Sequence, residues 1–226
     1  MKSKLFFALF FVVLGFVALQ IPVNTLAGSR VKFTLFDLFA PASGVFLGSG
    51  LGIVSVIAMQ AVNIATHGFS GLDHSSFLKL VATLRFLPTV VGVWFFAKRE
   101  GKLLIIPALA ILAFNLHPIG RTVWFYSLFW TIPFLVWPFR GKFLLARSLG
   151  STMTAHAVGG AVWIWAFNLP ANVWVSLIPV VILERAIFTL GISASYILMT
   201  NVLSVLSSKK LLPKSVTFEK KYLLKT

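Results

Sequence analysis

Residues 173–206 read VWVSLIPVVILERAIFTLGISASYILMTNVLSVL, and this stretch decides the class of fold. Its only charged residues are the neighbours Glu184 and Arg185. A helix that crosses a bilayer needs roughly 20 consecutive apolar residues, and this stretch is longer. A charge at membrane depth is expected to face a protein interior or a cavity. The stretch therefore predicts a membrane-spanning helix that carries its two charges toward the inside of a helical bundle.

The composition of the whole chain agrees with a membrane protein. Hydrophobic residues make up 58% of the 226 residues and charged residues only 11%, whereas an ordinary soluble domain carries roughly 25% charge. The mean hydropathy is +0.95. A soluble protein of this size has too little interior to bury so much apolar surface, which excludes soluble enzymes, disordered chains and fibrous repeats. The absence of cysteine excludes disulfides, thiolate metal sites and cysteine nucleophiles.

Eight apolar runs predict an all-α, polytopic integral membrane bundle of about six to eight transmembrane segments, some of them short or broken. The predicted segments lie near residues 5–21, 33–47, 51–66, 77–97, 103–115, 120–138, 148–167 and 173–206. They form one transmembrane domain over residues 1–206, and residues 207–226 form a basic cytoplasmic tail. The second and fifth segments are too short to cross the membrane upright. Such segments are tolerated where protein covers them or where they line a cavity, which indicates an irregular bundle around an enclosed space.

The basic residues predict the direction of the spans. The formal net charge is +15, and Lys and Arg collect in cytoplasmic loops. If eight spans alternate from a cytoplasmic N-terminus, most of the basic residues fall on the cytoplasmic side. We therefore expect the cytoplasmic membrane of a prokaryote, with both termini cytoplasmic. The charge then needs no nucleic acid as its explanation. One alternative stays open, in which residues 2–27 are a cleaved signal peptide and seven spans remain.

Four ionisable residues fall at membrane depth, namely Arg85, His156, Glu184 and Arg185. Consecutive residues of a helix point about 100° apart, so Glu184 and Arg185 are not expected to face the same spot. We expect Glu184 to pair with Arg85, His156 or Arg121. A purely structural ion pair is an equally good explanation of these charges.

Further polar and aromatic side chains lie near the outer ends of the predicted helices. Among them are Asn63 and Trp163. Most of the tryptophans are explained as anchors at the membrane interface, and one or two could instead stack on a planar ligand.

Small residues recur every four positions at Ala40, Gly44, Gly48 and Gly52. Such a row allows helices to approach closely in lipid. Packing within the chain explains it, and a second interpretation is that Gly44, Gly48 and Gly52 dock a partner membrane subunit.

Motifs for chemistry are missing from the sequence. It has no phosphate-binding loop, no GxSxG and no paired metal-ligand spacing. We therefore predict no catalytic residue, no metal and no cofactor, and a protein that is not an enzyme. Glu184 with His156 is weakly similar to the glutamate and histidine set of intramembrane CAAX-type proteases, although their paired glutamate is missing. An intramembrane hydrolase that uses these two residues stays an alternative, as does a non-catalytic membrane scaffold.

The order of features resembles a known family. Phe33–Asp37 leads into a short helix, Gly44–Gly52 continues into a second helix, Lys98–Lys102 ends a third, and Leu177–Pro179 opens the last. This passage resembles the substrate-binding S components of energy-coupling factor (ECF) vitamin transporters. The resemblance covers most of residues 5–102 and 172–206. It does not cover the segment 103–138, which adds a pair of spans to the six that are usual in the family.

The resemblance implies a function. An S component binds a micronutrient near the outer face of the membrane, and a coupling subunit with two ATPases then drives its release inside. Carried to this sequence, the substrate-binding residues are Asn63, Arg85, His156, Trp163 and Glu184, capped by the loops 23–32 and 67–76. The implied partners are a small vitamin-like substrate, membrane lipid, the transmembrane coupling subunit and the ATPase subunits, without nucleic acid.

Overall fold

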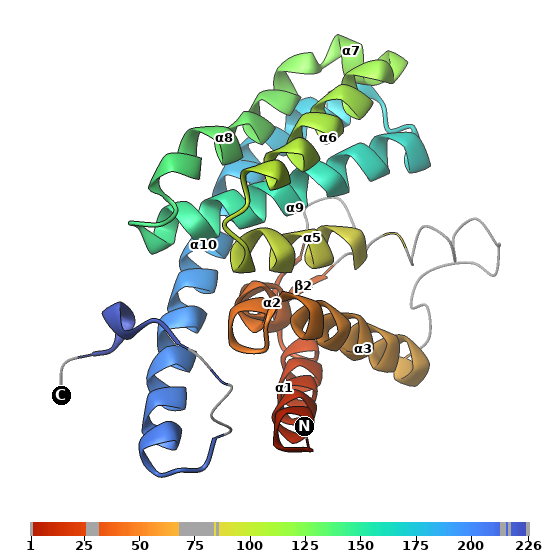
Figure 1. Cartoon of the computed structure of the whole chain (residues 1–226). Coiled ribbons are helices and arrows are strands. Elements are labelled where there is room, and N and C mark those ends of the chain that lie inside the picture. Colours follow the sequence, from red (N-terminus) through yellow and green to blue (C-terminus); the bar gives the residue numbers. More distant parts are fainter. Residues whose placement is uncertain are drawn as a thin grey trace.

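A computed structural model describes residues 2–25, 32–67, 84, 86–212, 216 and 218–224. Apart from one two-stranded ribbon, every regular element in these ranges is helical, which confirms the predicted all-α class. Figure 1 shows two groups of helices, with α1–α3 at one end, α5–α9 at the other, and the long helix α10 running beside both.

The N-terminal group contains three helices and the ribbon. Its elements are α1 (Lys2–Leu19), β1 (Pro22–Thr25), β2 (Lys32–Thr34), α2 (Leu35–Phe46) and α3 (Ser49–His67). The strands pair antiparallel, with Pro22 opposite Thr34. The Asp37 carboxylate accepts the Thr34 backbone N–H at 2.8 Å and so fixes the start of α2, where a negative charge is favourable. Gly48 has a φ of +85°, which permits the turn between α2 and α3.

The second group of helices begins with α5, which follows residues 68–83 in the chain. Its elements are α5 (Phe86–Ala97), η1 (Gly101–Leu104), α6 (Ile105–Leu116), α7 (Pro118–Thr122), η2 (Trp124–Thr131), α8 (Ile132–Val136), η3 (Trp137–Phe139), α9 (Leu144–Phe167) and α10 (Ala171–Ser208). A short η4 (Lys220–Tyr222) follows in the tail.

The prediction of a single helix over residues 120–138 is wrong. This stretch is divided among α7, η2, α8 and η3, and two of these pieces are 3-10 helices. Pro133 and Pro138 each stand within the first two positions of a new piece. Proline lacks a backbone N–H, so each of these two residues favours the start of a new helical piece, whereas no proline marks the break between α7 and η2. The ribbon at residues 22–34 was likewise not predicted.

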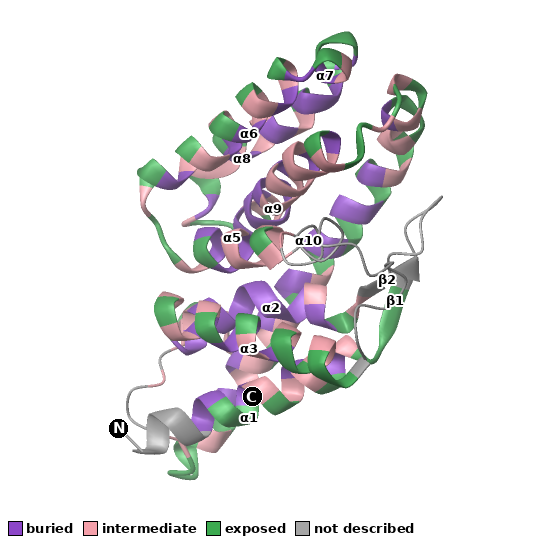
Figure 2. Ribbon diagram, turned by 90° about the vertical axis from the view of Figure 1, so that its right-hand side faces the viewer, coloured by how far each residue is buried: buried purple, intermediate pink, exposed green. Residues whose placement is uncertain are grey.

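Two apolar cores hold the helices together. The N-terminal core lies among α1, α2, α3, α5, the start of α9 and α10 from Phe188 onward, and its largest members include Phe11, Phe36, Phe46, Met59 and Tyr196. The C-terminal core lies among α6, η2, α9 and the first half of α10, and includes Phe114, Tyr126, Trp130, Ile164 and Trp174. Figure 2 shows that α2 is buried over most of its length.

The row of small residues packs helices within the chain. A Cβ at Gly52 would lie 2.6 Å from the Cα of Gly44, and a Cβ at Gly44 would lie 2.8 Å from the Val93 side chain of α5. Gly44 and Gly52 therefore bring α2 close to α3 and α5, while Gly48 forms the turn. Docking of a partner subunit at these glycines stays a prediction.

Two of the described helices are long and apolar enough to cross a membrane, over Ser49–Thr66 in α3 and Ala171–Ser208 in α10. The apolar parts of α1, α2, α5 and η1–α6 are shorter. Apolar side chains point outward in stripes with helical spacing. On α6 the exposed residues are Ile105, Leu109, Leu112 and Leu116, and on α10 they include Leu183, Leu190, Leu198, Val202 and Val205.

Candidate functional site

The middle of α10 carries a polar segment between the two apolar cores. Val181 belongs to the C-terminal core and Phe188 to the N-terminal core. Glu184 and Arg185 lie between them and are both buried. The helices α9 and α10 are antiparallel neighbours here, because Ser148 of α9 bonds Ser193 of α10 at 2.8 Å while Thr152, one turn later in α9, bonds the earlier residue Arg185 of α10. The junction of the two cores is thus lined by polar side chains from two helices.

The ion pair at this junction differs from the predicted pairing. The Glu184 Oε2 lies 3.5 Å from Arg185 Nη2, within the same helix. The prediction that the two residues do not meet was wrong, because the long Arg185 side chain reaches back across the 100° between their directions. Arg185 Nη1 also donates to Thr152 Oγ1 of α9 at 3.1 Å, and its guanidinium lies 4.3 Å from the centre of the Phe188 ring.

One carboxylate oxygen at the junction has no hydrogen-bond partner among the described residues. The Glu184 side chain is only 3% exposed, and its Oε1 is buried and unpartnered. A buried acceptor without a donor is unfavourable by about 1–3 kcal/mol. This oxygen can therefore accept a hydrogen bond from a water or from a ligand that brings an N–H or O–H group.

His156 of α9 stands beside this pair and both of its ring nitrogens are occupied. Trp130 Nε1 donates to His156 Nδ1 at 3.1 Å, and Tyr126 Oη lies 3.2 Å from His156 Nε2. An indole nitrogen can only donate, so Nδ1 must be the acceptor. The proton of the neutral imidazole then sits on Nε2, which donates to the Tyr126 oxygen. The hydroxyl proton of Tyr126 is left to donate elsewhere.

Aromatic rings close the site on the side of the C-terminal core. The Phe114 ring lies 5.0 Å from both Trp130 and Trp174, edge to face, and Tyr126 lies 5.0 Å from Trp174. Gly160 makes room for this arrangement, since a Cβ there would lie 2.4 Å from the Trp130 ring. Thr152, which accepts from Arg185, and His156, which contacts Tyr126 and Trp130, lie one helical turn apart on α9, so the ion pair and the aromatic side chains share one face of this helix.

The structure brings together only some of the predicted site residues. His156 and Glu184 share the junction. Asn63 instead accepts a 3.2 Å hydrogen bond from Gln20, which follows the end of α1, in the N-terminal group. Trp163 packs its ring 5.3 Å from Phe167, farther along α9. Arg85 lies outside the described residues, as do most of the two loops expected to cap the site.

Tyr126, Trp130 and Thr152 were not among the predicted site residues. The stretch WFYSLFW over residues 124–130 did stand out as aromatic, but tryptophans near helix ends are usually interfacial anchors. Their contact with His156 depends on the broken course of residues 118–139, which the hydrophobic pattern did not reveal. Among the described residues, no group of three His, Asp or Glu comes together as a metal site would require.

Comparison with known proteins adds one relative. The chain matches no described protein family, and no solved structure matches it. It is similar to an uncharacterized protein of Methanocaldococcus jannaschii, MJ0923, with 27% identity over 99% of this chain and 78% of that protein. The alignment therefore includes both groups of helices.

Proposed function

We propose that this chain is a polytopic membrane protein that captures a small polar molecule at the junction of its two cores. The capture is of the kind implied by the resemblance to ECF S components, and it involves no chemistry on the substrate. The observation that carries the proposal is the buried Glu184–Arg185 pair, which leaves one carboxylate oxygen without a donor. Intramembrane charges of this kind commonly mark substrate pathways.

The outward surface supports a membrane location. The exposed apolar stripes on α6 and α10 follow helical spacing over several turns, and contiguous exposed apolar surface of this kind marks contact with a membrane or a partner. The length and composition of α3 and α10 point the same way. We infer six to eight spans in the cytoplasmic membrane of a prokaryote. Cytoplasmic termini are supported by the basic residues that gather where α5 ends and α9 begins.

The chemistry of the junction suggests what the captured molecule carries. Glu184 Oε1 needs a hydrogen-bond donor, and Arg185 and Thr152 offer donors beside it. The aromatic rings of Tyr126 and Trp130 favour a flat apolar part. We infer a small molecule with an N–H or O–H group and an unsaturated ring. Most of this site comes from residues 103–167, which lie outside the resemblance to S components, so the coupling subunit and ATPases are proposed on the resemblance alone.

An intramembrane hydrolase is the weaker candidate. A general base or a metal ligand needs a free ring nitrogen, whereas both nitrogens of His156 are engaged by Trp130 and Tyr126. His156 acts here as a positioning residue that orients the two aromatic side chains.

The test is native mass spectrometry of the whole protein, extracted from membranes in a mild detergent. We expect a co-purifying small molecule with the wild-type protein and its loss in Glu184→Gln, which keeps the side-chain shape but removes the charge. Glu100→Gln is the matched control, because Glu100 is an exposed carboxylate in a loop. A mass without ligand across varied growth media would contradict capture, and protein found in the soluble fraction without detergent would contradict the membrane location.

A further inference from the structure

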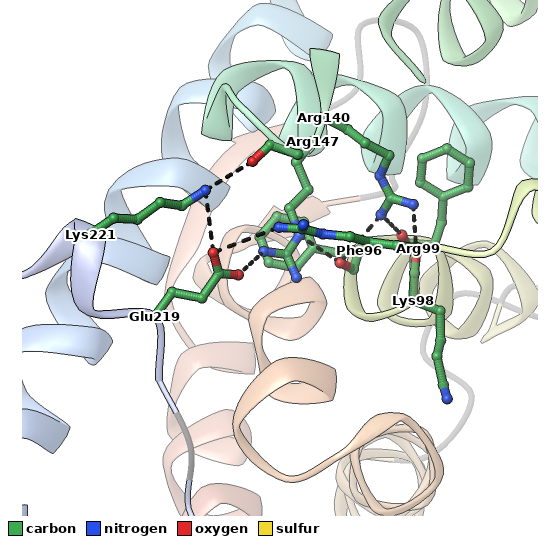
Figure 3. A network of polar contacts seen from close by, with 9 residues as sticks. Phe96, Lys98, Arg99, Arg140, Arg147, Glu219 and Lys221 are labelled. Carbon is green, nitrogen blue, oxygen red and sulfur yellow. Dashed lines mark hydrogen bonds and ion pairs between the residues drawn. The ribbon is translucent and has the colours of Figure 1, made fainter. Parts of the chain in front are cut away.

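A second polar network lies where α5 ends and α9 begins (Figure 3). Arg140, in the turn before α9, donates to the backbone carbonyls of Phe95, Phe96 and Lys98. Arg147 Nε donates to the Phe96 carbonyl at 2.7 Å. The last carbonyls of a helix lack intrahelical partners and attract positive charge, so the two arginines cap the C-terminal end of α5.

The tail folds back onto this network. Glu219 Oε1 lies 2.6 Å from Arg147 Nη1, while its Oε2 lies 3.3 Å from Lys221 Nζ and 3.8 Å from Arg99 Nη2. The Arg147 side chain is only 4% exposed. One carboxylate thus occupies a site made by cations from α9, the tail and the loop after α5. Only its contact with Arg147 is short, and Arg99 lies beyond hydrogen-bond distance.

The tail is held near this site by further contacts. Asn201 of α10 donates to the Tyr222 carbonyl at 3.0 Å and accepts the Leu224 backbone N–H at 2.8 Å. The Tyr222 ring packs edge to face on Tyr196 at 5.5 Å. These contacts keep the tail close even when the carboxylate is displaced.

Positive charge at the network exceeds the negative charge available. Residues 98–102, 140–147 and 219–221 contain eight basic residues and two acids. The basic residues are Lys98, Arg99, Lys102, Arg140, Lys142, Arg147, Lys220 and Lys221. Glu100 pairs with Lys98 and Lys102, which leaves Glu219 as the one acid for the arginines of these segments.

Arg140 shows the effect of this excess. Its Nε is buried without a hydrogen-bond partner among the described residues. Burial, together with repulsion from Arg147 and Arg99, lowers the pKa of its guanidinium to about 10. An additional anion at the network would relieve this repulsion.

The rim of the network is apolar and aromatic. Phe139, Phe143 and Leu145 are exposed around the same turn, and Lys142 Nζ lies 5.4 Å from the Phe143 ring centre. Exposed phenylalanine and leucine side chains beside basic residues are typical of surfaces that lie at the boundary of lipid headgroups and acyl chains, and anionic lipids attract basic clusters on the cytoplasmic side. The rim thus favours an anion that carries acyl chains over a free one.

We propose that Arg99, Arg147 and Lys221 bind the phosphate of an anionic phospholipid, and that Glu219 occupies this site when the lipid is absent. The proposal rests on the membrane location of the proposed function, but not on substrate capture. A phosphate offers more acceptor oxygens than a carboxylate and suits the planar fork of arginine. Displaced from Arg147 by the lipid, Glu219 would stay nearby because Asn201 holds the tail.

Native mass spectrometry with added phosphatidylglycerol or phosphatidylcholine of the same acyl chains tests the proposal. We expect wild-type protein to retain several-fold more phosphatidylglycerol. The double variant Arg99→Gln/Lys221→Gln should reduce this to the level of phosphatidylcholine, and Glu219→Gln should increase it. These two basic side chains are 54% and 41% exposed, so the variant is expected to fold. Arg121→Gln/Lys209→Gln, at an exposed arginine of α7 and an exposed lysine after α10, removes the same charge and is the matched control.

Three results would overturn the proposal. Equal retention of the two lipids would exclude a headgroup site. An equal loss of phosphatidylglycerol in this double variant and in the charge-matched control Arg121→Gln/Lys209→Gln would mean attraction by overall charge. Displacement of the lipid by millimolar inorganic phosphate would assign the site to a soluble phosphate. Failure of substrate capture would show separately. Wild-type protein would then carry no co-purifying small molecule, while its binding of phosphatidylglycerol stayed intact.

Discussion

The two apolar cores of this protein are built in different ways. The N-terminal core consists mainly of aliphatic and phenylalanine side chains, with Met59 and Tyr196, around a close backbone contact between Gly44 and Gly52. The C-terminal core is aromatic and is tied to the imidazole of His156, which accepts a hydrogen bond from Trp130 and donates one to Tyr126. The first is specified by shape and the second by directed polar contacts. A site that discriminates among ligands needs the second kind, since hydrogen bonds fix the positions of its walls.

The largest effect is expected from Trp130→Ala, which removes the centre of the C-terminal core. It should lower the free energy of unfolding by about 3–5 kcal/mol, because it opens a cavity and leaves His156 Nδ1 without a donor. Thermal unfolding in detergent measures the change. Trp124→Ala is the control, since Trp124 is 56% exposed and should change the value by less than about 0.5 kcal/mol. Equal effects of the two variants would refute the central position of Trp130.

The N-terminal core should be most sensitive to backbone spacing. Gly52→Ala places a methyl group 2.6 Å from the Gly44 Cα, which cannot move aside without shifting α2. We expect a loss of about 1–3 kcal/mol. In the same helix, Gly50→Ala meets no atom within 4 Å and should be neutral or stabilising by up to about 1 kcal/mol. If both substitutions had the same effect on the unfolding temperature, the close contact of α2 and α3 would be contradicted.

The polar contacts of the C-terminal core should be coupled rather than additive. Trp130→Phe keeps an aromatic ring but leaves the buried His156 Nδ1 without its donor, which is expected to lower stability by about 1–3 kcal/mol. In a His156→Leu background the same substitution removes no hydrogen bond and should have a smaller effect. A double-mutant cycle measures the difference. Strict additivity would show that the 3.1 Å contact contributes nothing to stability.

The smallest effect is expected at the tail and depends on pH. Burial by itself raises the pKa of Glu219, but Arg147 and Lys221 outweigh it and lower the pKa below the ordinary value of 4.5. The ionised carboxylate therefore supports docking at neutral pH, and this support is lost as the pH falls below 4.5 through the lowered pKa. Hydrogen exchange at residues 218–224 should quicken over that range after correction for intrinsic rates, whereas Glu219→Gln should show no such step.

The sequence predicted the long apolar helices well, because length and composition suffice for them. The helix expected over residues 173–206 is observed at 171–208, and the one expected over 148–167 is part of α9. Two things escaped prediction. Residues 120–138 form short pieces although their apolar pattern is continuous. Pro133 and Pro138, which have no backbone N–H, stand at the starts of two of these pieces. The pairing of Glu184 with Arg185 escaped because helix geometry fixes only where a side chain starts, whereas a long flexible arginine can end on a neighbouring face.

Only those residues of the candidate site that are unusual by themselves in the sequence could be predicted. His156 and Glu184 stood out because ionisable residues are rare in apolar runs. The contacts of Tyr126 and Trp130 with His156 were not predicted, since they depend on how the broken stretch 118–139 packs against α9. Glu219 in the tail was hidden for the same reason, because only the folded protein brings it to Arg147.

The length of α10 has a mechanical consequence. Its 38 residues make a rod about 57 Å long at 1.5 Å per residue. Each end is embedded in a different core, and the polar segment from Glu184 to Ser193 lies near its midpoint. A rod held in this way behaves as a lever with its fulcrum at the charged pair. A tilt of about 10° about this pair would carry the Ala171 end through roughly 3.5 Å and the Ser208 end through roughly 6 Å, so a small event at the charged pair would become a larger displacement at both ends of the helix.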